Sequence, residues 1–187
     1  LEGRLLGLDG VVEQHANYQK SGVERSYRNI RYEGLSGGSP PAGFEIVPLS
    51  TRSFDEVYEY DRPFFPDDRR EFLAQWVTQP HGTALGLIQN GKITGYSVLR
   101  PCRSGYKIGP LFADTPEFAD ALFRALKAHG EETAPIYLDT PEVNPEAVAL
   151  AERYDMHPVF ETARMYTGKP PDTPLNRVFG VTTFELG

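Results

Sequence analysis

Residues 137 to 168, YLDTPEVNPEAVALAERYDMHPVFETARMYTG, contain the most specific pattern in the chain. Apolar periodicity and turn residues predict a strand over 135–138, a helix over 144–154 and a strand over 157–166. A strand that leads through a helix into another strand is typical of a sheet with a helix packed on one face.

A β-hairpin precedes this unit. Two strand-like runs, Thr83–Gln89 and Lys92–Arg100, are separated by Asn90-Gly91. This dipeptide favours a tight hairpin turn, because both central residues must take positive φ. Another strand is predicted over 105–112. We therefore expect a mixed α/β (α+β) fold, whose twisted sheet is mostly antiparallel and carries helices on both faces.

The remaining elements are placed by local signals. Thr115 can cap and Pro116 can open a helix that ends near His129. Asp67 and Asp68 favour a helix start through the helix dipole. The other predicted elements are strands over 44–48 and 177–186, helices over 53–60 and 66–78, and a loop over 169–174.

A linker-like stretch divides the chain. Residues 33 to 43, EGLSGGSPPAG, concentrate glycine, serine and proline and have no apolar period. We predict a first part over 1–34, a linker over 35–43 and a domain over 44–187. The first part contains a strand, a helix and a strand, which bury too little apolar surface to fold alone. It must dock on the rest of the chain, on another copy or on further sequence. Its predicted elements are 4–8, 11–21 and 26–32.

The composition is that of a globular chain. Of the 187 residues, 40% are hydrophobic and 24% are charged. No apolar run approaches the roughly 18 residues that a membrane span needs. A net charge of −7 disfavours nucleic acid as a partner, because such affinity comes from neutralising phosphates. The negative charge mildly favours cationic or amine-bearing ligands by electrostatic steering.

Cysteine and histidine usage argues against a disulfide and a metal site. Cys102 is the single cysteine, and the four histidines have no metal-ligand spacing with it or with each other. We expect a cytoplasmic protein. The chain begins at Leu1 without a basic leader or an initiator methionine, so we also expect it to be part of a longer protein.

The order of elements from Phe44 to Gly187 resembles that of the GNAT acetyltransferases. Asn144, Ala147 and Leu150 match the family's N-x-x-A helix. The segments GPLFAD, PVFETARMYTG and VFGVTTFELG resemble the GNAT-like domain at the C-terminus of tandem GNAT proteins. The resemblance implies a sheet with splayed central strands, acetyl-CoA in the cleft between them, and acetyl transfer to an amine.

The resemblance extends to the N-terminal part. The segments LLGLDGVVEQHANYQKSGV and YRNIRYEG are similar to the last strand, helix and strand of a preceding GNAT domain. Tyr18 then matches the family's tyrosine that protonates the departing CoA thiolate. The alternative is that Tyr18 is a half-buried packing residue near a helix end.

Two family features are missing from the second domain. In place of the Q/R-x-x-G-x-G/A loop that holds the CoA pyrophosphate stands FADTPEFA, so Asp114 and Glu117 replace a basic residue and a glycine. Carboxylates, and Pro116 without an N–H, disfavour pyrophosphate at this helix end. Ala151 occupies the tyrosine position, and Tyr154 lies one turn later. These losses favour a degenerate copy.

Candidate site residues are those that the resemblance brings near the cleft. They are Tyr18 as catalytic acid; Leu111, Phe112, Ala113 and Asn144 as contacts of acetyl-CoA or CoA; and Tyr96, Tyr137 and Tyr166 as contacts of a small-molecule amine acceptor. Strand tyrosines are also common packing residues, and Arg100 with Asp139 could form a simple ion pair.

Two functions stay open. In the first, the protein is a GNAT N-acetyltransferase whose chemistry needs the upstream domain. In the second, this domain is a non-catalytic GNAT-like module that binds a ligand or a partner. If residues 1–32 find no partner within the chain, pairing with a second copy would give a homodimer. The sequence identifies neither the acceptor nor the general base.

Overall fold

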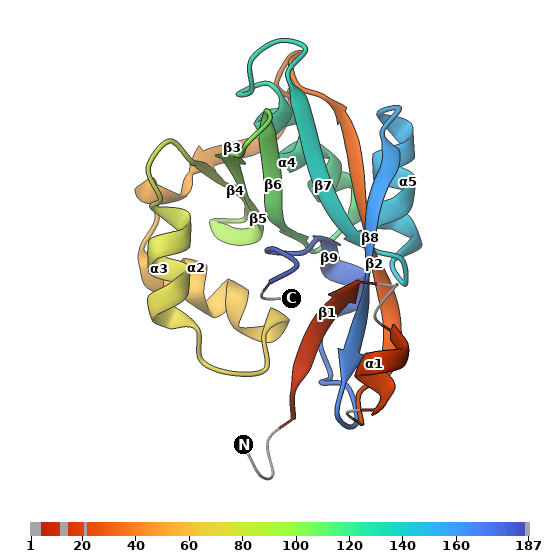
Figure 1. Cartoon of the computed structure of the whole chain (residues 1–187). Coiled ribbons are helices and arrows are strands. Elements are labelled where there is room, and N and C mark those ends of the chain that lie inside the picture. Colours follow the sequence, from red (N-terminus) through yellow and green to blue (C-terminus); the bar gives the residue numbers. More distant parts are fainter. Residues whose placement is uncertain (1–4, 12–14, 21, 186–187) are drawn as a thin grey trace.

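The computed structural model describes residues 5–11, 15–20 and 22–185, and nine strands in these ranges form one sheet (Figure 1). The strands are β1 Gly7–Val11, β2 Glu24–Leu35, β3 Glu45–Pro48, β4 Thr83–Gln89, β5 Lys92–Pro101, β6 Tyr106–Ala113, β7 Pro135–Pro141, β8 His157–Tyr166 and β9 Val178–Gly180. Across the sheet the order is β1-β8-β2-β7-β6-β5-β4-β3, and β9 pairs with β6.

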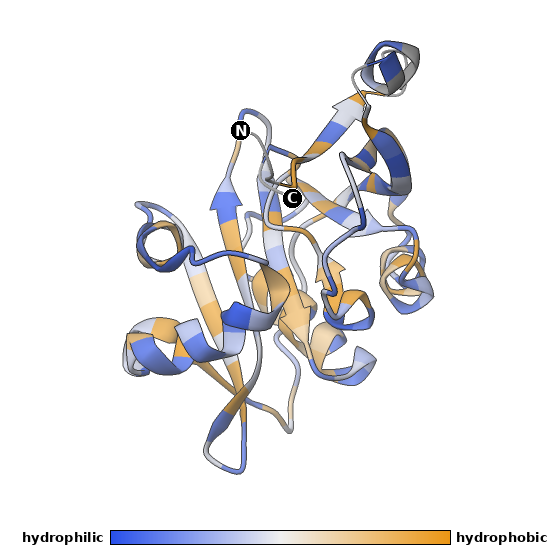
Figure 2. Ribbon diagram, turned by 90° about the horizontal axis from the view of Figure 1, so that it is seen from below, coloured by the Kyte–Doolittle hydropathy of each residue, from blue (hydrophilic) through white to orange (hydrophobic). Residues whose placement is uncertain are grey.

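Helices cover both faces of the sheet. The helices are α1 His15–Lys20, α2 Phe54–Asp61, α3 Arg70–Val77, α4 Pro116–Lys127 and α5 Pro145–Arg153. One apolar core packs α4 and α5 against the sheet, and a second packs α2 and α3 against it. Figure 2 shows hydrophobic strands between helices whose outer sides are hydrophilic. Only the β6–β7 pair is parallel among the described strands. The predicted mixed, mostly antiparallel sheet is confirmed.

Local sequence signals account for the firmest boundaries. Asn90 and Gly91 form the β4–β5 turn with φ values of 52° and 77°. The Thr115 hydroxyl accepts a hydrogen bond from the Phe118 N–H at 3.2 Å, which caps α4. The Asn144 side chain caps α5 in the same way. The predicted Asn90-Gly91 turn and Thr115 cap are confirmed, and all three signals act within a few residues.

Several predicted boundaries are wrong. The strand expected over 4–8 is β1 at 7–11, so the helix expected over 11–21 does not include Val11. That helix is described as α1 from His15 to Lys20, and residues 4, 12–14 and 21 lie outside the described ranges. The helix expected from Pro66 begins at Arg70, where the Asp68 carboxylate accepts from the Arg70 N–H at 2.9 Å and holds a local turn before the first helical residue. The long strand expected over 177–186 is the three-residue β9, preceded by a 3-10 turn at Leu175–Arg177.

The N-terminal part docks on the rest of the chain. β2 is a twelve-residue strand inserted between β7 and β8, antiparallel to both. Residues 36–43 form no helix or strand. Both edges of β2 are thus paired within the chain. The oligomeric state and the origin of residues 1–34 in a preceding domain stay predictions.

We expect Tyr32→Ala to destabilise the whole domain. Tyr32 on β2 is 6% exposed and packs in the core beneath α5, whereas Leu35 on the same strand is 58% exposed. Removing the buried ring should cost about 3 kcal/mol, while Leu35→Ala should cost less than about 0.5 kcal/mol. Urea unfolding measures both. Equal stability of the two variants would show that β2 is not integral to the fold.

Candidate functional site

The central strands part half-way along the sheet. β6 and β7 pair only from Tyr106 to Ile108, with Ile136 to Leu138 as partners. Beyond this point they diverge, and β9 enters the gap (Figure 1). Leu111 pairs with Gly180 and Phe112 with Val178, in antiparallel register. The cleft between the parting strands is therefore filled by the chain's own C-terminal segment.

Specific bonds hold β9 in this cleft. The Asn144 Nδ2 donates to the Val178 carbonyl at 2.9 Å, and the Val181 N–H donates to the Asp139 carbonyl at 2.8 Å. Gly109 and Gly180 permit a close approach. A Cβ at Gly109 would stand 2.7 Å from the Val181 carbonyl oxygen, and a Cβ at Gly180 would stand 2.7 Å from a methyl of Leu138. The segment therefore lies directly against the strand backbones.

The N-terminus of α4 is also occupied. Asp114 Oδ1 accepts from the Tyr60 hydroxyl at 2.9 Å and from Arg177 at 2.5 Å. Arg177 belongs to the 3-10 turn that leads into β9, and its guanidinium lies 4.9 Å from the centre of the Phe64 ring. Thr115 caps the helix. The Asp114 carboxylate and the Phe118 N–H at this helix end are therefore already bonded within the chain, whereas the buried Nε of Arg177 has no partner.

A buried ionic cluster lies between α2, α3 and β5. Arg69 donates to both carboxylate oxygens of Asp61, at 2.7 and 2.5 Å, and the Tyr96 hydroxyl donates to the same carboxylate at 2.5 Å. Complete burial, with the negative charge of Asp61 beside it, raises the pKa of Tyr96 far above its ordinary value. Arg69 also reaches the Thr182 hydroxyl at 3.3 Å. The cluster thus holds the segment that follows β9.

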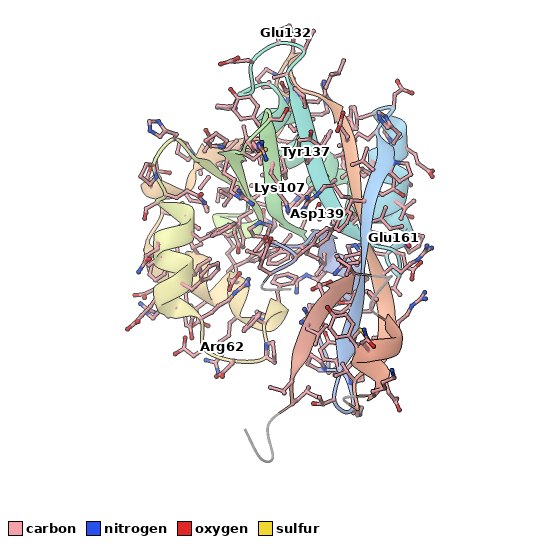
Figure 3. All side chains as sticks on the ribbon, viewed as in Figure 1. Arg62, Lys107, Glu132, Tyr137, Asp139 and Glu161 are labelled. Carbon is pink, nitrogen blue, oxygen red and sulfur yellow. The ribbon has the colours of Figure 1, made fainter. Side chains whose placement is uncertain are left out.

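A second ionic cluster stands where β6 and β7 part. The carboxylate of Asp139 on β7 accepts two hydrogen bonds from the Arg31 guanidinium on β2, at 2.7 Å from Nε and 2.9 Å from Nη2. It also accepts one from the Lys107 ammonium on β6. Figure 3 shows Lys107 and Asp139 close together near the centre of the sheet, with Tyr137 above them. Burial lowers the pKa of Lys107 despite the attraction of Asp139. These side chains lie beside a cavity of about 300 Å³.

The sequence profile of the acetyltransferase (GNAT) domain matches residues 57–180, which is most of the chain. The chain belongs to the GNAT acetyltransferase family. The profile covers the parting of β6 and β7, the N-terminus of α4, and β9.

Relatives of this GNAT chain are longer than it is. Holothin acyltransferase from Pseudoalteromonas sp. (strain SANK 73390) is 25% identical over 184 residues, which cover 98% of this chain and 63% of that protein. The crystal structure of a Pyrococcus horikoshii protein assigned as an acetyltransferase has a TM-score of 0.80 at 23% identity and covers 98% of this chain and 60% of that chain. A tandem GNAT protein from the clavulanic acid biosynthesis pathway has a TM-score of 0.55 at 13% identity, over 89% of this chain and 65% of that one. The two structures show the shared fold alone.

The four residues expected to contact CoA do lie together. Leu111, Phe112, Ala113 and Asn144 are at most 3% exposed and surround the point where β9 enters. In this structure Leu111 and Phe112 pair with β9, and Asn144 holds its Val178 carbonyl. Their contact with CoA stays a prediction, and in the described arrangement their partner is β9.

Of the tyrosines expected at the site, Tyr96 and Tyr166 lie near Phe112, whereas Tyr18 and Tyr137 lie elsewhere. Tyr18 packs half-buried beside Met165 of β8, and β2 and β7 lie between β8 and β6. Tyr96 lies in the buried Asp61 cluster. Tyr166 on β8 accepts from Arg164 at 3.0 Å and lines the same cavity as Phe112 and Val178. Tyr137 lines the cavity beside Lys107. Their contacts with a substrate stay predictions.

Sequence reasoning missed the Arg31, Asp139 and Lys107 cluster. The ion pair considered for Asp139 was with Arg100, but its described partners are Arg31 and Lys107. The one available signal was a charged residue within an otherwise apolar strand, as at Lys107 in YKIGPLFA. A buried charge of this kind requires a partner.

Neither a membrane-spanning helix nor a metal-binding group of side chains occurs in the described part of the chain. No helix there is long and apolar enough to cross a membrane. No group of three or more His, Cys, Asp or Glu side chains there is arranged to hold a metal ion. The cytoplasmic location stays a prediction.

We expect Asn144→Ala to loosen β9. The change removes the cap of α5 and leaves the buried Val178 carbonyl without its donor, which should cost about 1–3 kcal/mol in the free energy of unfolding. Asn176→Ala, at an exposed position of the adjacent 3-10 turn, is the matched control and should change little. Denaturant unfolding distinguishes them. An Asn144 variant as stable as the control would mean that this bond does not retain β9.

Tyr154, one turn from the family's acid position, should hold its proton to high pH. Partial burial and its hydrogen bond to Asp120, 2.9 Å long, raise the pKa of Tyr154 from 10 to about 12. The folded state then binds more protons than the unfolded state between these values, so the free energy of unfolding falls as pH rises from 10 to about 12. The free energy of unfolding of the Tyr154→Phe variant, measured by urea titration at each pH, should fall less steeply over this range. Parallel curves would contradict the raised pKa.

Proposed function

We propose that this chain is part of an N-acetyltransferase that transfers the acetyl group of acetyl-CoA to a small-molecule amine, and that its own GNAT domain is a non-catalytic partner of the catalytic one. In this reaction the amine nitrogen attacks the thioester carbonyl, the C–S bond breaks, the thiolate takes up a proton and the amine loses one. Family membership and the acyltransferase relative support this class of reaction.

The filled cleft is the observation that carries the proposal. In the family resemblance, acetyl-CoA occupies the space between the parting central strands. Here β9 pairs with β6 in that space, through Leu111 and Phe112. A ligand there would have to break the β9 pairing and the Asn144 bond to Val178 before it could bind. That cost opposes cofactor binding in this domain.

The helix end expected to meet the pyrophosphate supports the same conclusion. Anions bind helix N-termini through free N–H groups and the helix dipole. At α4 the Asp114 carboxylate already lies there with Tyr60 and Arg177, Thr115 caps the Phe118 N–H, and Pro116 has no N–H. A pyrophosphate would meet the negative charge of Asp114 and a Phe118 N–H that is already bonded.

A catalytic role for the rest of the protein follows from the resemblance of the N-terminal part. We assign Tyr18 as the candidate acid of a preceding GNAT domain. The described domain would then support that domain or shape the acceptor side. A second candidate, a ligand-binding module, is favoured by the polar cavity beside Lys107.

Calorimetric titration of this chain with acetyl-CoA and with CoA tests the proposal. We expect no saturable heat, meaning a Kd weaker than about 1 mM, or less than ~4.1 kcal/mol of binding free energy. Thermal melts should likewise show no shift, since a ligand at about 100 times its Kd stabilises by ~2.7 kcal/mol. Micromolar binding of acetyl-CoA would overturn the non-catalytic assignment and would direct the work to amine acceptors for this domain.

A further inference from the structure

The cavity beside Lys107 is bounded by strands that are distant in sequence. It lies where β2, β5, β6 and β7 approach the segment after β9, and its volume is about 300 Å³. Lys107 and Tyr137 occupy paired positions on β6 and β7, while their neighbours Ile108 and Ile136 belong to the core under α4 and α5. The cavity therefore opens on the sheet face opposite α4 and α5, away from the α4 N-terminus.

Positive charge dominates the lining. Four cations, Arg31, Arg100, Arg103 and Lys107, line the cavity, and Glu185 is the carboxylate among its lining residues. The carboxylate of Asp139 lies behind and is shared by Arg31 and Lys107. The four lining cations are therefore accompanied by two carboxylates, Glu185 in the lining and Asp139 behind it, so the cavity carries an excess of positive charge.

Arg100 and Arg103 are left without a carboxylate. Within the described ranges neither forms a salt bridge, and the buried Nε of Arg100 has no hydrogen-bond partner. A buried guanidinium N–H without an acceptor is costly, because it has lost water and gained nothing. An acceptor supplied by a ligand would remove this cost.

Contacts within the chain hold three of the four cations, Arg31, Arg100 and Lys107, before any ligand arrives. The Arg100 guanidinium lies 5.4 Å from the centre of the Trp76 ring, and the indole N–H of Trp76 is itself fixed by the Gly109 carbonyl at 2.9 Å. The centre of the Phe184 ring lies 4.6 Å from the guanidinium carbon of Arg31 and 5.1 Å from the Nζ of Lys107. Pre-organised cations bind an anion at a lower entropic cost.

We infer that this cavity binds a small molecule through an oxoanion group, a carboxylate or a phosphate, held between Arg100 and Lys107 with Arg103 at the rim. A planar guanidinium matches two oxygens of such a group, and the ammonium adds a point charge. The volume lies at the lower end of the range for ligand pockets, about 300 to 1,000 Å³, which favours a small metabolite. The inference does not require acetyl transfer or CoA binding by this domain.

Titration of the full chain with inorganic phosphate and, separately, with succinate tests the inference. Both titrations are run at constant ionic strength against sodium chloride, because screening alone would mimic weak binding. We expect at least one probe to saturate with a sub-millimolar Kd and to raise the melting temperature. The stronger probe identifies whether the cavity prefers phosphate or carboxylate.

Matched substitutions locate the bound probe. Arg100→Gln should weaken binding about tenfold, equivalent to ~1.4 kcal/mol, whereas Arg62→Gln should leave it unchanged. Arg62 is exposed and lies well away from Lys107 (Figure 3). If Arg100→Gln does not fold, Arg100→Lys replaces it in the test. This variant keeps the charge but loses the planar guanidinium, and it should weaken binding of the probe several-fold. No saturation beyond the chloride control, or an equal loss in the Arg62 and Arg100 variants, would overturn the inference.

Discussion

Asp139 joins the parts of the molecule that the sequence keeps far apart. Its carboxylate binds Arg31 of β2 and Lys107 of β6, and its carbonyl accepts the N–H of Val181, just after β9. One residue at the parting of the central strands therefore holds the inserted N-terminal strand, the two central strands and the C-terminal segment. Because the carboxylate is fully buried, its partners are needed to offset the loss of water.

The C-terminal segment borders two different spaces, the cleft between β6 and β7 and the cavity beside Lys107. The cleft between β6 and β7 is filled by β9, which rests on Gly109 and on Asn144. The polar space on the opposite side of Lys107 remains open, with Phe184 and Glu185 of the C-terminal segment at its wall. The C-terminal segment thus fills the space between the central strands and forms part of the wall of the cavity beside Lys107.

Local interactions explain which features were predictable from sequence. The Asn90-Gly91 turn and the Thr115 cap depend on residues within three positions of one another. The position of β2 depends on partners across the whole chain, and nothing local encodes them. Resemblance grouped Leu111, Phe112 and Ala113 with Asn144, but β9 as their neighbour required the fold. Arg31 and Asp139 are 108 residues apart in the sequence, so no local spacing predicts that they pair.

Hydrogen exchange at the Val181 amide tests most directly whether the chain itself fills the cleft. This N–H is bonded to the Asp139 carbonyl at 2.8 Å, in the middle of the parting strands. We predict protection comparable to that of the β6 and β7 core amides, unchanged by millimolar acetyl-CoA. Fast exchange, or protection that disappears when acetyl-CoA is added, would contradict a cleft closed by β9 and would mean that the cofactor displaces it.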